Sequence, residues 1–452
     1  TTIFTIAESP LDENIIWVGT DDGNVQVTKD GGKNWQNVVS NIQGLPSNTW
    51  TYHIEASVHG KGIAYAVFDG HNSGDMQPYA YKTTDFGMTW TNIITDNIIG
   101  TSRNIQEDYE NENLLFLGTE FGLYITADGG NHWEKFTKNI PPVAVHFIDL
   151  QKQTNDLVLG THGRGIIIIE DISPLREIYT EVLKAKLHFF SSKPMKLSDE
   201  SGFSGSFGAE TQFVGENANR SPQIKYLLPK RHTFGKMSME IRDSSGEVIS
   251  KLTPGKSKGI NIVNWSGNIK QPKIAKGKTL AFGGFATPRV QAGLYTAVII
   301  KGKEFYEHTF EIVNDERSGL SLADRNLKHD IIAKMYKMTE ELAFMVYQID
   351  TFIESLETKS KLKSKLNQLK KTLVITTGDN YVGSAEPELR EKLADLFSKI
   401  VQSYDKPSNS ELGYLSIVEN RYLKAKKDFD KISKKIKSKR DIKLKTFEEF
   451  KK

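Results

Sequence analysis

Six polar side chains stand in short turns between expected β-strands, where a folded chain could present them to a ligand. They are Asp69, His71, Asp75, Tyr79, His162 and Arg164. Carboxylate, imidazole, phenol and guanidinium groups bind charged or polar partners through hydrogen bonds and ion pairs. Hydrolysis of a glycosidic bond demands more, because two carboxyl groups must lie about 5 to 10 Å apart. Each of the six also fits a turn-stabilising or solvated role, so the sequence predicts a candidate ligand face and no catalytic residue.

Motifs for other chemistries are missing from the sequence. There is no P-loop, no HExxH and no GxSxG pattern, which are the marks of phosphate binding, zinc proteolysis and serine hydrolysis. The chain has no cysteine, which excludes disulfides, zinc-thiolate sites and thiol nucleophiles. We therefore expect no cofactor and no metal site, and whether the protein is an enzyme stays open.

The elements that must position these groups are repeated. A turn motif, T-x-D-x-G-x-x-W, occurs at Thr28 to Trp35, Thr83 to Trp90 and Thr126 to Trp133. A short carboxylate can accept backbone N–H groups in such a turn, glycine can adopt positive φ, and the indole can cover the gap to a neighbouring sheet. We expect a structural role for the motif residues, which are Thr28, Asp30, Gly32, Trp35, Thr83, Asp85, Gly87, Trp90, Thr126, Asp128, Gly130 and Trp133.

A second phrase precedes these turns and sets the size of the repeat. "VGTDDGNVQVT", "LGTEFGLYIT" and "LGTHGRGIIIIE" each read as a strand, a tight turn and a second strand, and "IAYAVFDG" with the insertion His71 to Pro78 gives a fourth copy without the GT pair. Phrases and turns that recur in this order along a chain are typical of β-propeller blades, which are four-stranded antiparallel sheets. In such a blade the turn between strands two and three lies on the face opposite the T-x-D-x-G-x-x-W turn. The six polar residues are therefore expected to gather on one face.

The turn motif is similar to the Asp-box, or BNR repeat, of sialidases, xyloglucanases and sortilin-type receptors. The order of phrases, ending in "GTHGR" at Gly160 to Arg164 and "EDISPLR" at Glu170 to Arg176, resembles the C-terminal half of bacterial VPS10/sortilin-like repeat proteins, often labelled glycosyl hydrolases. The sequence departs from that family in carrying "IIIIED" where a tryptophan is usual. The resemblance implies that residues 1–176 are about four blades of a larger ring.

Two functions follow from the resemblance. The first is a non-catalytic binding or scaffold protein that holds a peptide, protein or glycan in a sortilin-like propeller. The alternative is a glycoside hydrolase, sialidase- or xyloglucanase-like, with its catalytic carboxylates in missing N-terminal blades. Both imply upstream blades as a partner, on an N-terminal segment or a separate chain, so the chain is expected to begin partway through a longer gene product.

Beyond the propeller, the patterns predict three more regions. Residues 177–221 are expected to be a linker and a Gly/Ser-rich loop. Alternating strands in 222–316 predict an immunoglobulin-like β-sandwich, similar to the FlgD type in "IRDSSGEVISKL", "NIVNW" and "AGLYTAVI". Apolar residues at three- and four-residue steps in 321–452 predict an α-helical bundle. The fold class is therefore multidomain and mainly β, with helices at the C-terminal end.

Charge is distributed unevenly along the chain. The net charge is only +3, but residues 321–452 hold 28 Lys and Arg against 20 Asp and Glu, with a basic run at Lys424 to Lys445. This run fits either a solvated helix face or a patch for anionic surfaces. No motif supports nucleic-acid binding, and no apolar stretch reaches the roughly 18 residues of a membrane span. Composition and resemblance together suggest a secreted, periplasmic or cell-surface protein of a bacterium of the Bacteroidetes type.

Overall fold

The computed structural model describes residues 2–197, 221–278, 286–315, 319–377, 386–438 and 440–451. The chain divides into two compact units, Thr1–Lys186 and Leu187–Lys452. Nearly all of the loop expected at 198–221 lies outside the described residues.

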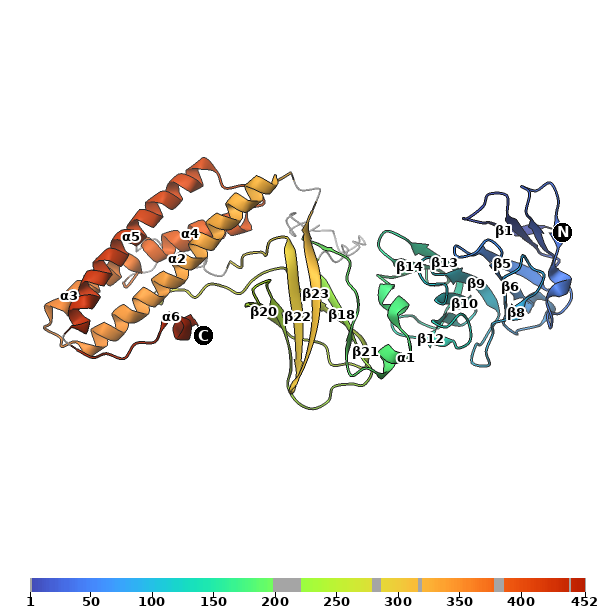
Figure 1. The fold of residues 1–452 in the computed structure, drawn as a ribbon, viewed down its shortest axis with the longest axis horizontal. Helices are drawn as coiled ribbons and strands as arrows, with labels where there is room; N and C mark the ends of the chain where they lie inside the picture. Colours follow the sequence, from blue (N-terminus) through green and yellow to red (C-terminus); the bar gives the residue numbers. More distant parts are fainter. Residues whose placement is uncertain are drawn as a thin grey trace. The chain divides into compact units, whose positions relative to one another are not determined.

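The N-terminal unit is a succession of antiparallel sheets in which the strand order follows the chain (Figure 1). The first sheet holds β1 (Ile3–Glu8), β2 (Ile16–Thr20), β3 (Val25–Thr28) and β4 (Gln36–Asn37). The second holds β5 (Trp50–Ala56), β6 (Ala64–Asp69), β7 (Tyr79–Thr83) and β8 (Thr91–Asn92). The third holds β9 (Ser102–Glu107), β10 (Leu115–Thr119), β11 (Gly122–Thr126) and β12 (Glu134–Phe136), and the fourth holds β13 (Ala144–Gln151), β14 (Asp156–His162) and β15 (Ile166–Ile169). Short helices η1 (Val39–Asn41), η2 (His71–Ser73), η3 (Ser173–Glu177) and α1 (Thr180–Lys184) complete the unit.

These sheets stack face to face, each against the next. The first strands β1, β5, β9 and β13 are neighbours in that order, and separate apolar cores fill the spaces between consecutive sheets. Every residue of β6 and β10 is buried, because a sheet covered on both faces needs continuous apolar strands. The mainly β character and the propeller-type stacking expected from the repeats are therefore confirmed.

The second unit begins with two sheets that enclose one core. The larger runs in the order β17 (Met195–Leu197), β23 (Glu304–Asn314), β22 (Gly293–Lys301), β19 (Met237–Arg242) and β20 (Val248–Leu252). The smaller runs in the order β16 (His188–Phe189), β18 (Gln223–Leu228) and β21 (Gly259–Asn264). Fully buried Trp265 packs edge-on against Tyr295 and Phe310 in the core between them. This is the two-layer arrangement of a β-sandwich.

Helices form the rest of this unit: α2 (Leu322–Ser355), α3 (Lys361–Leu373), α4 (Leu389–Gln402), α5 (Asn409–Lys437) and α6 (Phe447–Lys451). Ser321 caps α2 by accepting the N–H of Asp324, and a capping box of Ser408 and Glu411 starts α5. Both signals are typical of helix N-termini. The apolar stripe of α2 is buried in the shared helical core, as its three- and four-residue spacing indicates.

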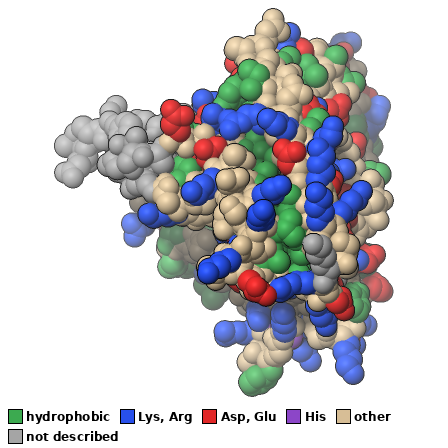
Figure 2. Space-filling view, turned by 90° about the vertical axis from the view of Figure 1, so that its left-hand side faces the viewer, with side chains coloured by type: hydrophobic (Ala, Val, Ile, Leu, Met, Phe, Trp, Pro, Cys, Tyr) green, Lys and Arg blue, Asp and Glu red, His purple; other side chains and the backbone are tan. Residues whose placement is uncertain are grey.

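The basic run of the C-terminal region lies mainly on α5. The lysines of the run that the structure describes are exposed, whereas Phe429 and Ile436 are buried in the helical core. Figure 2 shows Lys and Arg side chains spread over one face of the molecule, with fewer Asp and Glu. Phe429 and Ile436 are therefore occupied by packing, whereas the described lysines meet solvent, as do the apolar side chains of Ile417 and Leu423 on the same helix. In the described part of the chain, no helix is both long enough and apolar enough to cross a membrane.

Candidate ligand-binding site

Each of the four sheets of the N-terminal unit has a β-bulge at the same place in its first strand. In the third sheet, for example, Ser102 pairs with Thr119 and Asn104 pairs with Gly118, which leaves Arg103 between them without a partner. The same skip occurs in the other three sheets. A bulge re-aims the side chain of its extra residue. We call the four bulged residues the bulge row: Phe4, Tyr52, Arg103 and His146.

The members of the bulge row contact one another. The rings of Phe4 and Tyr52 lie 5.3 Å apart between centroids, and the Arg103 guanidinium lies 5.1 Å from the centroid of the Tyr52 ring. The Tyr52 hydroxyl lies 3.1 Å from Nδ1 of His146. A cation over an aromatic face and a phenol–imidazole hydrogen bond are both favourable. The bulges therefore gather side chains from four sheets into one aromatic and cationic cluster.

Glycines of the repeated GT phrase explain how consecutive sheets come so close. A Cβ added at Gly19 would lie 2.4 Å from Cγ2 of Thr51, and one added at Gly118 would lie 2.5 Å from the carbonyl oxygen of Val145. Both obstacles belong to the first strand of the following sheet. A side chain at either glycine would push that strand away. The GT phrase therefore lies on the second strand of a sheet, where that strand pairs with the bulged part of the first strand.

A charged network surrounds Arg103. Its guanidinium bonds the buried carboxylate of Asp69 and, at 2.9 Å, the half-exposed carboxylate of Glu120. Oδ2 of Asp69 also lies 2.6 Å from Nδ1 of His71. Two carboxylates hold the arginine in place, which favours its position beside Tyr52.

Further polar atoms on the first strands have no hydrogen-bond partner in the described part of the chain. On β9 they are the Ser102 hydroxyl, Nε of Arg103 and Oδ1 of Asn104, and on β5 they are Nε1 of Trp50 and Nδ1 of His53. Burial of an unpaired polar atom is unfavourable, and such atoms are uncommon in folded proteins. Their concentration on two neighbouring first strands indicates that this part of the sheet stack is suited to polar contacts.

Burial keeps two members of the row neutral. It raises the pKa of Tyr52 above its ordinary value of 10.0, with Arg103 opposing the shift. It lowers the pKa of His146 below 6.5, and the positive charge of Arg103 lowers it further. Tyr52 and His146 therefore meet at neutral pH as an uncharged phenol and imidazole beside one fixed cation. The row can stack on apolar groups and exchange hydrogen bonds with polar ones.

The structure brings three of the six sequence-predicted residues to this cluster. Asp69 joins it through Arg103, His71 joins it through Asp69, and the ring of His162 stacks on His146 at 5.5 Å. The hydroxyl of Tyr79, the first residue of β7, donates to Asp75 of the insertion at 2.8 Å, and burial raises the pKa of Tyr79 to about 12. Arg164 lies in the exposed β14–β15 turn. The bulge row itself was missed by sequence reasoning, although the GT phrase opposite it was visible.

The turn-motif residues form the local bonds that their types allow. In the first copy the Thr28 hydroxyl donates to Asp30 and accepts the N–H of Gly32, and Asp30 accepts the N–H of Asn34. These hydrogen bonds, the side-chain amide of Asn34 foremost, lower the pKa of Asp30 to about 2. The equivalent bonds recur around Asp85 and Asp128. The Thr and Asp side chains of the motif therefore make their hydrogen bonds within their own turn.

The tryptophans of the three copies differ in what they cover. Trp133 is buried, and its Nε1 donates to the carbonyl of Ile93, which follows β8 of the preceding sheet. Trp90 meets Trp17 of the preceding sheet edge to face at 6.1 Å. Trp35 belongs to the first sheet of the chain and is 43% exposed. Trp90 and Trp133 thus contact the preceding sheet, whereas Nε1 of Trp35 donates to the carbonyl of Gly32 in its own turn at 3.1 Å.

A second layer lies three residues beyond the bulge row on the same strands. It contains Glu55, Gln106 and Asp149, and the Gln106 amide donates to Oε1 of Glu55 at 2.5 Å. Burial raises the pKa of Glu55 from 4.5 to about 8. No group of three or more His, Asp or Glu side chains in the described ranges is arranged to hold a metal ion.

Successive up-and-down antiparallel sheets with their first strands side by side define the N-terminal unit as a β-propeller type of protein. No family model matches the chain, and no curated protein does. Among solved structures, the chain is similar to one described as YCF48 bound to D1 peptide, at 18% identity over 38% of this chain and 50% of that one, with a TM-score of 0.30.

It is also similar to a GH74 xyloglucanase from Xanthomonas campestris, at 12% identity over 69% of this chain and 45% of that one, with a TM-score of 0.32. A third match is the GH74 enzyme of Niastella koreensis, at 11% identity over 69% and 46%, with a TM-score of 0.28. The chain spans about half the length of these structures. Similarity at this level assigns neither an activity nor a partner to the chain.

Proposed function

We propose that the N-terminal unit is a non-catalytic binding module that holds an extended peptide segment of a partner across the bulge row. The observation that carries this proposal is the bulge that recurs in four consecutive first strands and turns Phe4, Tyr52, Arg103 and His146 towards one another. Four positions at regular steps suit a ligand that is itself extended and repeating.

The chemistry of the row favours a peptide with an aromatic or apolar residue among polar groups. Phe4 is 46% exposed and edge-on to Trp50 at 4.5 Å, so it offers an accessible apolar surface. Asp69 and Glu120 already bind the Arg103 guanidinium, so the polar contacts come from the neutral Tyr52 and His146, which can each exchange hydrogen bonds with backbone groups. Aromatic residues and arginine are the residue types that contribute most to peptide and protein interfaces.

The alternative function is a glycoside hydrolase whose catalytic carboxylates lie in upstream blades. The carboxylates nearest to the bulge row, Asp69 and Glu120, are both bound to the Arg103 guanidinium. That arrangement positions an arginine, whereas a glycosidase needs one carboxylic acid to donate a proton and a second carboxylate on the other side of the bond. Binding is therefore the function that these side chains support better.

Upstream blades are part of the proposal. The exposed Trp35 occupies the same motif position as Trp90 and Trp133, and we propose that a preceding blade buries it as the preceding sheets cover those two. On the last sheet, Phe147, Ile166 and Ile168 are 67%, 72% and 59% exposed on one face. An apolar sheet face of this kind is typical of a surface that another element covers. Together these features support an intact ring that contains further blades. The sequence resemblance alone leads us to propose that this ring is secreted or attached to the envelope.

The experiment is selection of peptides from a random phage-displayed library on the 452-residue chain, with counter-selection on the Phe4→Ala variant. Selected peptides are then synthesised and titrated by fluorescence polarisation. The proposal expects peptides that carry an aromatic residue and lose about tenfold or more in affinity for Phe4→Ala. Peptides that bind both proteins equally would show that the row is not the binding surface.

A further inference from the structure

Residues 424–437, the second half of α5, hold seven lysines and two aspartates. Five of the lysines recur at three- and four-residue steps, so they lie on one face of the helix. All five are exposed, and the opposite face, which holds Phe429 and Ile436, is buried in the helical core. We call these five residues the lysine stripe: Lys424, Lys427, Lys431, Lys434 and Lys435.

No ion pair neutralises the lysine stripe in the described part of the chain. Among the ion pairs that the described residues form, Lys426 is the one member of 424–437 to take part, with Glu341 at 2.8 Å. Like charges three or four positions apart destabilise a helix. A row of lysines kept on one face in spite of this repulsion is suited to a partner that carries negative charge.

Helix α3 adds to the positive charge beside α5. It packs against α5 in the helical core, and its 13 residues include five lysines and no acidic residue. Of the carboxylates that precede it, Asp350 is matched by Lys370 at 2.5 Å. Glu357 is matched by Arg440 at 3.7 Å. Figure 2 looks at the side of the molecule on which α3 and α5 lie, and it shows Lys and Arg side chains spread over this side with hydrophobic side chains between them.

The residue types of this surface favour a broad anionic partner over a nucleic acid. Residues 424–437 and α3 contain no arginine, the residue whose planar guanidinium binds single phosphate groups in a fixed geometry. Phe429 is the one aromatic residue of these two segments, and it is buried. The two segments therefore offer no exposed ring for stacking on a nucleobase.

An exposed aliphatic side chain borders the lysine stripe. Leu423 is 52% exposed, and it lies directly before Lys424 and four positions before Lys427, on the same side of the helix. Ile417, earlier on α5, is 58% exposed. Aliphatic groups beside lysines suit the boundary between headgroups and acyl chains of a bilayer, because the long lysine stems keep their ammonium groups at the level of the phosphates. A soluble polyanion would gain nothing from them.

We propose that the lysine stripe, with α3 beside it, is a peripheral contact surface for a bilayer of anionic lipids. The ammonium groups of the stripe lie among the lipid phosphates, and Leu423 reaches the boundary of the acyl chains. This contact belongs to the second unit and is independent of the peptide surface proposed for the propeller.

The test is co-sedimentation of the 452-residue chain with two kinds of vesicle, phosphatidylcholine alone and an equimolar mixture of phosphatidylcholine and phosphatidylglycerol. We expect the chain to bind the mixed vesicles, less tightly as salt is added, and not to bind the neutral ones. The triple variant Lys427→Gln, Lys431→Gln, Lys434→Gln should weaken binding about a hundredfold, because each lysine near an anionic bilayer contributes about fivefold.

Two further variants separate the stripe from net charge and a bilayer from other polyanions. Lys251→Gln, Lys256→Gln, Lys258→Gln removes the same charge from exposed lysines of the sandwich and should change binding by less than about twofold. Leu423→Ala should weaken vesicle binding about fivefold, because it removes aliphatic surface, and should leave the affinity for heparin, a soluble polyanion, unchanged.

Three results would overturn the proposal. The first is that the mixed vesicles do not bind, while circular dichroism shows a folded chain. The second is that the two triple variants weaken binding equally, which would indicate a diffuse effect of net charge. The third is that Leu423→Ala leaves vesicle binding unchanged, because the surface would then attract polyanions in general and not a bilayer.

Discussion

The Tyr52 hydroxyl lies 3.1 Å from Nδ1 of His146, although the two residues come from the second and fourth sheets of the N-terminal unit. A contact between sheets that are not neighbours requires both side chains to turn inwards past the sheet between them. The bulge in each first strand provides that turn. It also leaves Arg103, from the sheet between, beside the same ring.

Removing Arg103 should destabilise the protein much more than removing its exposed partner. Arg103→Met leaves the fully buried Asp69 carboxylate without its guanidinium, and the expected loss is about 3 kcal/mol or more. Glu120 is 42% exposed, so Glu120→Gln should cost less than about 1 kcal/mol. Urea unfolding followed by circular dichroism measures both. Equal losses would mean that Asp69 is solvated after the arginine is gone.

The box tryptophans should differ in the same way. Trp133→Ala opens a cavity in a closed core and breaks the bond to Ile93, at an expected cost of about 3 to 5 kcal/mol. Trp35→Ala removes an indole that is 43% exposed and should cost less than about 1 kcal/mol in this chain. If upstream blades are added on a longer chain, the cost of Trp35→Ala should rise towards that of Trp133→Ala. A cost that stays low on the longer chain would contradict the proposed preceding blade.

The pH dependence of stability should reveal Glu55. Its pKa is about 8 in the folded chain and 4.5 ordinarily, so between these values the folded state keeps a proton that the unfolded state has released. Stability from this group is therefore present below pH 4.5 and falls as pH rises through 8, with a slope of at most about 1.4 kcal/mol per pH unit. Glu55→Gln should flatten the decline, as measured by urea midpoints from pH 5 to 8. An unchanged slope in the variant would place the titrating group elsewhere.

Glycine substitutions separate close packing from chain flexibility. Gly118→Ala should cost about 2 kcal/mol or more, because its Cβ would lie 2.5 Å from a backbone oxygen of the next sheet. Gly413→Ala lies inside α5 with nothing within 4 Å, so it should stabilise the chain by about 0.5 to 1 kcal/mol. Thermal unfolding of the two variants checks the signs. A neutral Gly118→Ala would show that the sheets can separate without cost.

The sequence allowed prediction of elements that leave a repeated mark. The T-x-D-x-G-x-x-W turns and the GT pairs predict the sheets. The apolar residues at three- and four-residue steps from Ile331 to Ile349 predict the long helix α2. The bulge row could not be found in this way. Its members, an aromatic, a phenol, a cation and an imidazole, share no residue type, and an unpaired residue in a strand is defined only by its register with a partner strand. The place of Arg103 in the bulge row therefore follows only from the register of β9 with β10, in which Gly118 and Thr119 pair with the residues on either side of Arg103.

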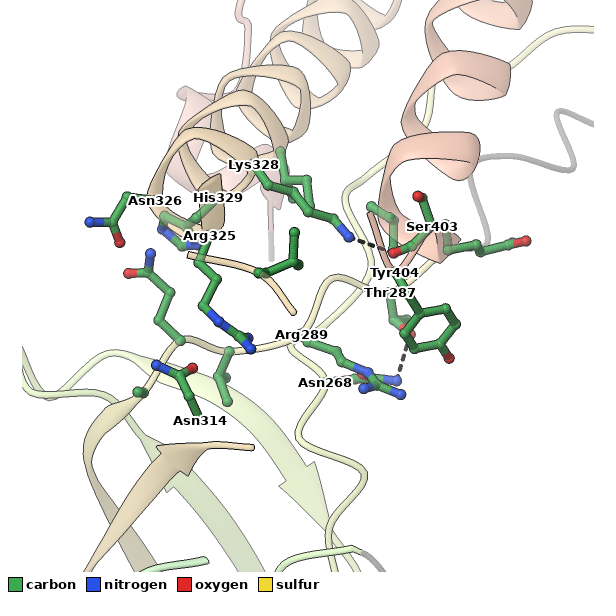
Figure 3. A pocket seen from close by; sticks show the side chains of 18 of the residues that line it. Asn268, Thr287, Arg289, Asn314, Arg325, Asn326, Lys328, His329, Ser403 and Tyr404 are labelled. Carbon is green, nitrogen blue, oxygen red and sulfur yellow. Dashed lines mark hydrogen bonds between the residues drawn. The ribbon is translucent and has the colours of Figure 1, made fainter. Parts of the chain in front are cut away.

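The sequence also could not predict that the sandwich and the helices of the second unit line one cavity, of about 610 Å³ (Figure 3). Arg289 and Arg325 both line it, although they stand 36 positions apart in the sequence. Only the packing of the two regions within the second unit brings both residues to one cavity.

The most direct test of the binding function is the affinity of a selected peptide for the wild-type chain and for two matched aromatic variants, Phe4→Ala and Phe305→Ala. Both rings are well exposed, 46% for Phe4 in the bulge row and 63% for Phe305 on β23, so neither change should unfold the protein. The account predicts that Phe4→Ala weakens binding about tenfold while Phe305→Ala has no effect. Equal affinities of all three proteins would contradict the assignment of the bulge row as the binding surface.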